Sequence, residues 1–429
     1  MKVLWFTGGM LPKICREVGL RPSVTGGFMS SLADIIADSG EIELGVASCS
    51  PNIRETHVFL NNVEYYAVPV SDMSKMERYP DPDILNACVN IAKDFDPDIV
   101  HVHGTEYFYG ILTADNHINC PSVISIQGFL GACWEHYYGG ISERQLFLNR
   151  SLSDSLFRAG LFEQKRNLQR RINMETEIIR KNSAFMGRTT WDKSYLQRIN
   201  PDACYYHCDE TLRPAFHSIK WSFESVIPQS IFVSTGAIPL KGLHVMLKAL
   251  SLISGDFPDV TLRLAHTFPK GRVQKPSFID RMKGQNYRNY LYSLIAEMGL
   301  HSRIISLGEL SASEMAEELA KANVFVVPSF IENSPNSLCE AMMVGTPCIA
   351  SFTGGIPSLV QDRRNALCFQ AGDEISLARC LRIVLARPDL SKRISCCARA
   401  TALNRHDNNA ILNRVTKVYH KVLKKGLIR

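Results

Sequence analysis

The sequence has no long apolar run, and none of its hydrophobic segments approaches the ~20 residues that a helix needs to cross a bilayer. It also has no repeat of fixed period and no low-complexity segment. The excess of charge is small, because 48 lysines and arginines stand against 42 acidic residues and leave a net charge of +6. Binding to nucleic acid is therefore not expected, although a local basic patch facing an anionic surface fits this balance.

Common nucleotide, disulfide and metal motifs are missing as well. There is neither a GxGxxG dinucleotide fingerprint nor a Walker A loop. The 13 cysteines include no CxxC pair, so we expect reduced thiols that pack as small apolar side chains in a cytoplasmic protein. Cys204–Cys208 contains two cysteines and a histidine, and His101 and His103 precede Glu106, but neither group has a second ligand pair. We expect no metal site.

The composition and the order of the apolar segments indicate a folded α/β chain. The 429 residues are 45% apolar, which suffices for a sizeable core, and at roughly 150 residues per domain they make two or three domains. Short β-rich segments alternate with turns and helical segments, a pattern typical of parallel sheets covered by helices on both faces. We expect two doubly wound domains. The expected strands are 3–7, 42–47, 99–102 and 122–126, then 230–234, 260–265, 304–307, 324–327 and 347–350.

The alternation pauses near the middle of the chain, where we expect a linker at residues 215–228. The N-terminal domain then covers 1–218 and the C-terminal domain 219–406. The opening segment Met1–Thr7 is too short for a signal peptide and is expected to form the first strand. Residues 407–427 are expected to form a terminal helix with a basic end.

Residues 161–181 are predicted to form an amphipathic helix with its apolar residues on one stripe. Arg166, Arg170 and Lys181 project from the opposite side. Two interpretations remain open for this charged side. It is either the solvated face of an ordinary helix, or a cationic face that meets anionic lipid or a diphosphate-bearing acceptor.

The turn after the expected strand 324–327 carries the clearest functional pattern, because ligands of open parallel sheets bind beyond the carboxyl ends of the strands. Ser334 is expected to cap a helix whose first residue is Pro335. The amides of Asn336 and Ser337 then lack acceptors within the helix, so the helix start is suited to an anion such as a diphosphate.

Two carboxylates flank this helix start. Glu332 lies in the turn before it and Glu340 in its second turn. Carboxylates beside a phosphate site are unfavourable unless they accept hydrogen bonds from hydroxyls, and the hydroxyls of ribose and hexose are natural donors. Both residues are therefore candidates for holding a sugar.

Further candidates follow other strands. Lys241, just before a helix, could neutralise a leaving diphosphate, and Gly354-Gly355 would let the backbone approach a ligand closely. In the first half, His103 and Gln127 each follow a strand and are expected to reach the crevice between the domains as hydrogen-bonding groups. The pair Gly26-Gly27 precedes a helix and could line the opposite wall of that crevice.

From Glu332 to Glu340 the sequence resembles the Glu-x7-Glu signature of the retaining glycosyltransferases of family 4, which have the GT-B fold. The resemblance continues in Val327-Pro328-Ser329, in Gly345-Thr346-Pro347 and in Gly354-Gly355. The segments 103–106, 187–192 and 331–337 are similar to the bacterial branch that builds surface polysaccharides such as capsule and exopolysaccharide. The resemblance implies two Rossmann-like domains facing a central cleft, with the terminal helix crossing back to the N-terminal domain, which then comprises 1–218 and about 407–429.

The resemblance also implies a reaction. A hexosyl or N-acetylhexosaminyl group would move from a UDP- or GDP-linked donor to a hydroxyl of a glycan or polyprenyl-diphosphate-linked saccharide, with retention and without a metal ion or cofactor. Glu340 would hold the ribose and Glu332 the donor sugar, while Lys241 would stabilise the departing diphosphate. His103 is expected to take part in catalysis.

Peripheral contact with the inner face of the membrane would fit a polyprenyl-diphosphate-linked acceptor. The remaining donor-side residues are Gly26, Gly27, Gly236, Ser334, Asn336, Ser337, Gly354 and Gly355; Gln127, Glu106 and Arg188 are assigned to the acceptor side.

Three positions depart from the family pattern. Ala237 stands where members often have an arginine, Gln127 where many have a histidine, and Ser358 where a glutamate is common. Arg188 and Arg263 are candidates for the missing cation. An alternative is therefore a weak or inactive nucleotide-sugar-binding subunit of a glycan assembly complex, and a phosphorylase or an epimerase on the same fold is a further one.

Overall fold

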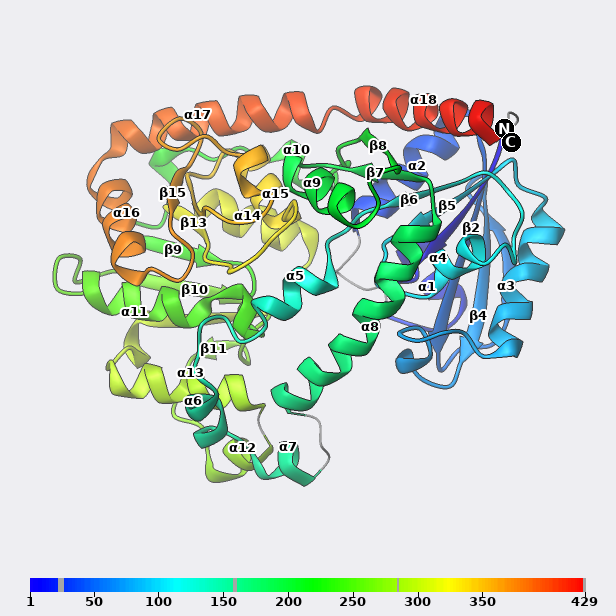
Figure 1. Ribbon diagram of the computed structural model, residues 1–429. Coiled ribbons are helices and arrows are strands. Elements are labelled where there is room, and N and C mark those ends of the chain that lie inside the picture. Colours follow the sequence, from blue (N-terminus) through cyan, green and yellow to red (C-terminus); the bar gives the residue numbers. More distant parts are fainter. Residues whose placement is uncertain (22–26, 157–159, 284, 427–429) are drawn as a thin grey trace. The chain divides into compact units, whose positions relative to one another are not determined.

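The computed structural model describes residues 1–21, 27–156, 160–283 and 285–426 (Figure 1). They form two compact units. The first comprises Met1–Gly131, Gln169–Arg213 and Arg405–Arg429, and the second comprises Ala132–Leu168 and Pro214–Asn404. Each unit has its own mostly parallel sheet with helices on both faces, so the expected pair of doubly wound α/β domains is present. No helix within the described residues is both long and apolar enough to cross a membrane.

The division differs from the expected boundaries in two segments. Residues 132–168 were assigned to the N-terminal domain, but Ile141, Leu146 and Leu161 belong to the core of the second unit. The expected linker at 215–228 is packed rather than free, because the Trp221 indole donates to the Ala322 carbonyl at 2.8 Å. Both segments lack strands, so the alternation of strand and helix gave no sign of the unit to which they belong.

The first unit has an eight-stranded sheet of order β3-β4-β2-β1-β5-β6-β7-β8. Its strands are parallel except for β3, which runs antiparallel to β4. The expected strands are confirmed with small shifts of their ends, and β3, β4, β7 and β8 were not predicted. The strands are β1 (Lys2–Thr7), β2 (Glu43–Pro51), β3 (Thr56–Leu60), β4 (Val63–Val70), β5 (Ile99–His103), β6 (Ser122–Ser125), β7 (Ala184–Gly187) and β8 (Cys204–His207).

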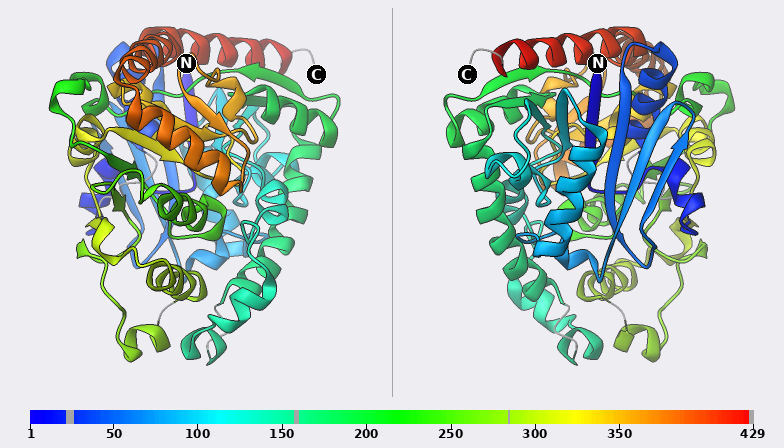
Figure 2. Two further views of the ribbon diagram at one scale, coloured as in Figure 1. Left: turned by 90° about the vertical axis from the view of Figure 1, so that its left-hand side faces the viewer. Right: turned by 90° about the vertical axis from the view of Figure 1, so that its right-hand side faces the viewer.

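Successive side chains of β1 point to opposite faces of the sheet, and helices of this unit cover both faces. Val3 and Trp5 pack with α2 (Gly27–Ser39) and the terminal helix α18 (Asn408–Gly426) in one core cluster. On the other face lies α3 (Pro82–Phe95), and the right-hand view of Figure 2 shows the blue strands with helices on either side. The other helices of this unit are α1 (Pro12–Glu17), α4 (Tyr109–Ala114), α5 (Leu130–Glu135) at its boundary, the end of α8 (Leu161–Lys181) and α9 (Thr190–Ile199), with the 3₁₀ turn η1 (Met73–Lys75).

The second unit has a seven-stranded sheet of order β11-β12-β10-β9-β13-β14-β15, antiparallel only at β11. Its strands are β9 (Ser230–Val233), β10 (Thr261–Ala265), β11 (Gly271–Arg272), β12 (Ile304–Gly308), β13 (Val324–Val327), β14 (Cys348–Ser351) and β15 (Leu367–Phe369). The α-helices are α6 (Glu143–Leu148), α7 (Leu152–Leu156), α10 (Ala215–Ser218), α11 (Leu243–Ile253), α12 (Phe278–Lys283), α13 (Asn286–Glu297), α14 (Ala312–Lys321), α15 (Asn336–Val344), α16 (Glu374–Ala386) and α17 (Pro388–Arg405). The 3₁₀ turns are η2 (Phe223–Ser225), η3 (Pro239–Lys241), η4 (His301–Arg303) and η5 (Ile356–Ser358).

Candidate functional site

The second unit has a topological switch point between β9 and β13. The chain passes from β9 to β10 on one side and later returns to β13 on the other side of β9. At such a point the loops beyond the carboxyl ends of the strands diverge and leave room for a ligand. The loops after β9, β13 and β14 contain most of the donor-side residues expected from the sequence.

Lys241 and Glu332 meet at this edge of the sheet. The Lys241 Nζ lies 2.6 Å from Glu332 Oε1, and the Ser329 hydroxyl donates to the same oxygen at 2.7 Å. The side chains of Lys241 and Glu332 are only 28% and 12% exposed. A charge-assisted contact of this length fixes both side chains, so a cation and a carboxylate are held side by side where the sheet can accept a ligand.

The three loops also interlock through their backbones. The Phe330 amide donates to the Leu240 carbonyl, and the Gly355 amide donates to the Glu332 carbonyl, both at 2.9 Å. Gly242 has a φ of +69°, and a Cβ there would lie 1.9 Å from the Pro328 carbonyl oxygen. Only glycine permits this approach, so the β9 loop is fixed against the β13 loop by main-chain contacts.

The helix after β13 starts one residue later than expected. α15 begins at Asn336, and its N-cap is Pro335 without a side-chain hydrogen bond, so Ser334 is not the cap. Asn336 and Ser337 occupy the first turn as predicted, where helix geometry leaves the amides without intrahelical acceptors. Glu340 is buried in the following turn, with 6% of its surface exposed.

Of two further predicted residues, Gly236 lies at this edge of the sheet and Arg263 does not. Gly236 belongs to the β9 loop, where a Cβ would collide with the Leu243 side chain at the start of α11. Arg263, a candidate for the missing cation, lies on β10 and forms a two-point ion pair with Glu318 of α14. That pairing commits its guanidinium away from the β9 and β13 loops, so the expectation for Arg263 is wrong.

Sequence reasoning missed a histidine that ties another segment to these loops. His244, the second residue of α11, donates from Nε2 to the Gly139 carbonyl at 2.9 Å and accepts from the Tyr287 hydroxyl at Nδ1 at 3.0 Å. Its ring stacks on Phe330 of the β13 loop at 5.6 Å. Burial lowers the pKa of His244 to about 4, which agrees with a neutral ring in this bonding pattern. The pair Gly139-Gly140 was the available sequence signal.

In the first unit the corresponding switch point lies between β1 and β5. A pocket of about 280 Å³ opens there, lined by Gly8-Gly9 after β1 and by His103, Glu106 and Gln127. The structure thus brings together three of the residues that the sequence assigned to the acceptor side or to catalysis. Gly26 lies outside the described residues, and Gly27 starts α2 against the Arg213 side chain.

His103 is the most unusual group in this pocket. It is buried, with 5% of its surface exposed, and neither ring nitrogen has a hydrogen-bond partner among the described residues. Its ring stacks on His101 at a centroid distance of 4.0 Å and lies against Trp5 in a tilted contact at 4.4 Å. Burial, together with the nearby Arg188 guanidinium, lowers the pKa of His103 to about 3. A neutral imidazole with unsatisfied nitrogens can give and accept hydrogen bonds, but it is a weak base.

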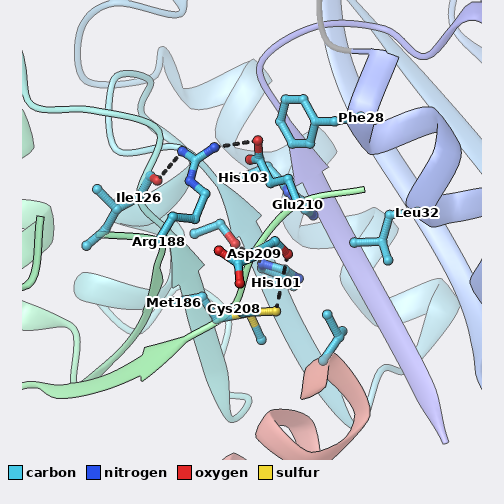
Figure 3. Close-up of a pocket in the computed structure, with 12 residues that line it drawn as sticks. Phe28, Leu32, His101, His103, Ile126, Met186, Arg188, Cys208, Asp209 and Glu210 are labelled. Atoms are coloured by element: carbon cyan, nitrogen blue, oxygen red, sulfur yellow. Dashed lines mark hydrogen bonds and ion pairs between the residues drawn. The ribbon is translucent and has the colours of Figure 1, made fainter. Parts of the chain in front are cut away.

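Arg188 is engaged in a buried network beside His103 (Figure 3). Its guanidinium pairs with the Glu210 carboxylate and donates to the Ile126 carbonyl at 2.6 Å and to Gln127 Oε1 at 3.2 Å. Gln127 in turn donates to Glu210 at 3.2 Å. Arg188, Glu210 and Ile126 line a small cavity of about 30 Å³ together with His103. Arg188 therefore orients Gln127, and no local sequence pattern indicated Glu210.

Of the cationic side predicted for α8, Lys181 forms ion pairs within the protein, whereas Arg166 and Arg170 are exposed. Lys181 contacts Asp115 at 2.7 Å and also Glu177, and Arg171 contacts Glu77 at 2.8 Å. Leu161, Leu168 and Ile179 of the apolar stripe are buried. These contacts favour the interpretation of α8 as an ordinary amphipathic helix.

Glu175 is a second buried carboxyl group, and it connects two loops that line the pocket. The Thr105 hydroxyl and the Leu130 amide donate to Glu175 at 2.8 and 2.9 Å, so this α8 residue joins the loops after β5 and β6. Burial raises the pKa of Glu175 to about 8. The folded protein therefore keeps a proton there that the unfolded chain loses near pH 4.5, and stability falls as the pH rises from about 4.5 towards 8.

We expect Glu175→Gln to remove this pH dependence. In the native protein the unfolding free energy should decline by up to about 1.4 kcal/mol per pH unit across this window because of Glu175. Urea unfolding at pH 5, 6, 7 and 8 measures the slope, and the control is Glu177→Gln, a partly exposed change on the same helix. An unchanged slope in Glu175→Gln would show that the buried carboxyl is not protonated.

Comparisons with known proteins give a family match for part of the chain and a fold match for almost all of it. Residues 218–401 match the family model described as glycosyl transferases group 1. The second unit thus carries a group 1 glycosyltransferase domain. The chain is 27% identical over 242 residues to a D-inositol 3-phosphate glycosyltransferase of Streptomyces scabiei, an alignment covering 54% of this chain and 52% of that protein. The chain therefore spans about half the length of this curated relative.

Solved structures match almost the whole chain. Sucrose-phosphate synthase from Thermosynechococcus elongatus superposes with a TM-score of 0.74 at 15% identity, covering 99% of this chain and 100% of that one. Anabaena HepE in complex with UDP-glucose superposes with a TM-score of 0.66 at 15% identity, covering 98% and 100%. At these identities the likeness concerns the fold, and the expected two-domain GT-B fold is confirmed.

Proposed function

We propose that this protein is a retaining glycosyltransferase that moves a hexosyl or N-acetylhexosaminyl group from a nucleotide-sugar to a hydroxyl. The observation that carries the proposal is the contact between Lys241 and Glu332 at the β9/β13 switch point, inside the segment that matches the family model. UDP is the favoured donor nucleotide, because the structural neighbour HepE is described with UDP-glucose.

The second unit supplies the donor side of this reaction. Breaking the bond between sugar and phosphate builds negative charge on the diphosphate. Lys241 and the amides at the start of α15 would stabilise that charge, and a fixed cation does so without reorganisation during the reaction. Glu332 holds Lys241 in place and can accept a hydroxyl of the donor sugar, while Glu340 would accept those of the ribose. The leaving phosphate oxygen can take the acceptor proton, so no protein base is required.

The first unit supplies the acceptor side. His103, Glu106 and Gln127 line a pocket large enough for a sugar ring. With a pKa of about 3, His103 would act by hydrogen bonding to an acceptor or donor hydroxyl rather than as a general base. We assign Arg188 an orienting role through Gln127. The acceptor would be a glycan or a polyprenyl-diphosphate-linked saccharide, in the synthesis of surface polysaccharide at the cytoplasmic side of the membrane.

Thermal unfolding with a panel of UDP- and GDP-sugars tests the donor assignment. A ligand that binds only the native state adds stability of about 2.7 kcal/mol at 100 times its Kd, so the correct donor should raise the melting temperature more than its competitors. Nucleotide release is then followed with and without candidate acceptors. Release that requires an acceptor supports transfer, and release without one supports an epimerase or a hydrolase. Donor binding without turnover on any acceptor would support the inactive subunit.

A further inference from the structure

Large apolar side chains are exposed on three short helices of the second unit. α6 and α7 follow each other in the chain, α7 packs against α12, and Figure 1 shows the three helices at one end of this unit. Their exposed fractions lie between 55% and 78%. We call this group the apolar tip; its members are Phe147, Leu148, Leu152, Leu156, Phe278 and Ile279.

The polarity of α7 is inverted. Leu152 and Leu156 are four residues apart, lie on one side of the helix and are exposed, whereas Asp154 is buried. The Asp154 carboxylate accepts a hydrogen bond from the backbone amide of Asn286 at 2.9 Å. A surface helix ordinarily buries its apolar residues and exposes its polar ones. The opposite arrangement leaves apolar surface in contact with water unless something covers it.

The helices of the tip are held in place by polar contacts. The Asn286 side chain donates to the Leu146 carbonyl at 3.4 Å, and the Asn289 side chain donates to the Asn149 carbonyl at 3.3 Å. Arg150 forms an ion pair with Glu163 at 2.7 Å. The inward side of the tip therefore combines these polar contacts with the buried Leu146 of α6, while its outward side is apolar.

Basic side chains predominate around the tip. In the described parts of residues 143–156 and 275–282, the exposed charged side chains are Arg144, Lys275 and Arg281 against Glu143 and Asp280. Asp280 also accepts hydrogen bonds from Ser277. A second copy of the chain would bring these basic residues against their own counterparts, which is unfavourable in a symmetric contact. An anionic partner suits them better.

We propose that the apolar tip docks this protein on an anionic lipid bilayer, with its six apolar side chains in the headgroup region and its basic residues against lipid phosphates. Apolar residues flanked by lysine and arginine are the usual combination for binding in the plane of such an interface. The proposal deepens the proposed function, on which it rests for the lipid-linked acceptor, and it places membrane contact on the tip rather than on α8.

Vesicle binding of the full chain, without donor or acceptor, tests the proposal. We expect cosedimentation with phosphatidylglycerol/phosphatidylcholine vesicles, weaker binding to phosphatidylcholine alone, and partial loss in 1 M NaCl, where the Debye length falls to about 3 Å. The double variant Leu156→Glu/Phe278→Glu should lower the partition coefficient about tenfold or more, because it places carboxylates where apolar surface would insert. The matched controls Ile375→Glu and Phe59→Glu alter equally exposed apolar residues elsewhere and should bind like the native chain.

Two outcomes would overturn the proposal. One is equal vesicle binding by the native chain and the double variant, or none by either. The other is a dimer in sedimentation velocity that the double variant dissociates, which would make the tip a contact between copies. Circular dichroism confirms that the variants fold. Transfer to a soluble acceptor should be the same in the native chain and the double variant, so failure of membrane docking and failure of the proposed function are separate results.

Discussion

Lys241→Ala should lower turnover with a nucleotide-sugar by about two to three orders of magnitude, the range found when one charge-stabilising donor is removed. The native ammonium group lies 2.6 Å from the Glu332 carboxylate. Its loss removes a cation from the leaving diphosphate and also leaves the carboxylate of Glu332 without its cation near that diphosphate. Initial rates of nucleotide release at saturating donor and acceptor measure the effect.

Two further variants make this prediction specific. Lys248→Ala removes a lysine of the same α11 region whose Nζ lies 3.9 Å from Glu374, and it should leave turnover unchanged. The double variant Lys241→Ala/Glu332→Gln should bind donor better than Lys241→Ala alone, since it removes the unpaired carboxylate. Native turnover in Lys241→Ala would refute the assignment of this cation to the diphosphate.

The sequence predicted those parts of the site that are local in the chain. Lys241, Glu332 and Gly354-Gly355 each follow a strand of a parallel sheet, and the carboxyl ends of neighbouring strands share one edge. Once the strands were recognised, their convergence followed from topology alone. The start of α15 was misplaced by one residue because Ser334 and Pro335 both favour the first positions of a helix.

Contacts between distant segments were not predictable in this way. The pairing of Arg188 with Glu210, the contact of Glu175 with Thr105, and the bond from His244 to Gly139 join segments that no local pattern relates. The β3–β4 hairpin could have been found. Its turn residues Asn61 and Asn62 have φ values of 49° and 60°, and an asparagine pair between β-rich segments is typical of such turns.

Gly354→Ala should reduce both stability and the apparent affinity for the donor. Gly354 has a φ of +51°, and a Cβ there would lie 2.1 Å from the Glu332 carbonyl oxygen. Alanine pays about 1–3 kcal/mol for such a backbone conformation, and it must in addition push the Glu332 loop away. Because Glu332 holds Lys241, displacement of this loop separates the two charged groups at the donor site.

The measurement is the melting temperature together with kcat/KM for the donor, for which we expect a fall of about tenfold or more, equivalent to 1.36 kcal/mol per tenfold. Gly299→Ala is the control for the backbone, because Gly299 has a φ of +66° and nothing within 4 Å of a Cβ. Gly255→Ala controls for the substitution itself, because Gly255 has open space around a Cβ and no positive φ.

If Gly354→Ala lost stability as Gly299→Ala does but kept its kcat/KM, the loop would not position Glu332 for the donor. A selective loss of kcat/KM in Gly354→Ala would instead link the close approach of these two backbones to the chemistry at Lys241.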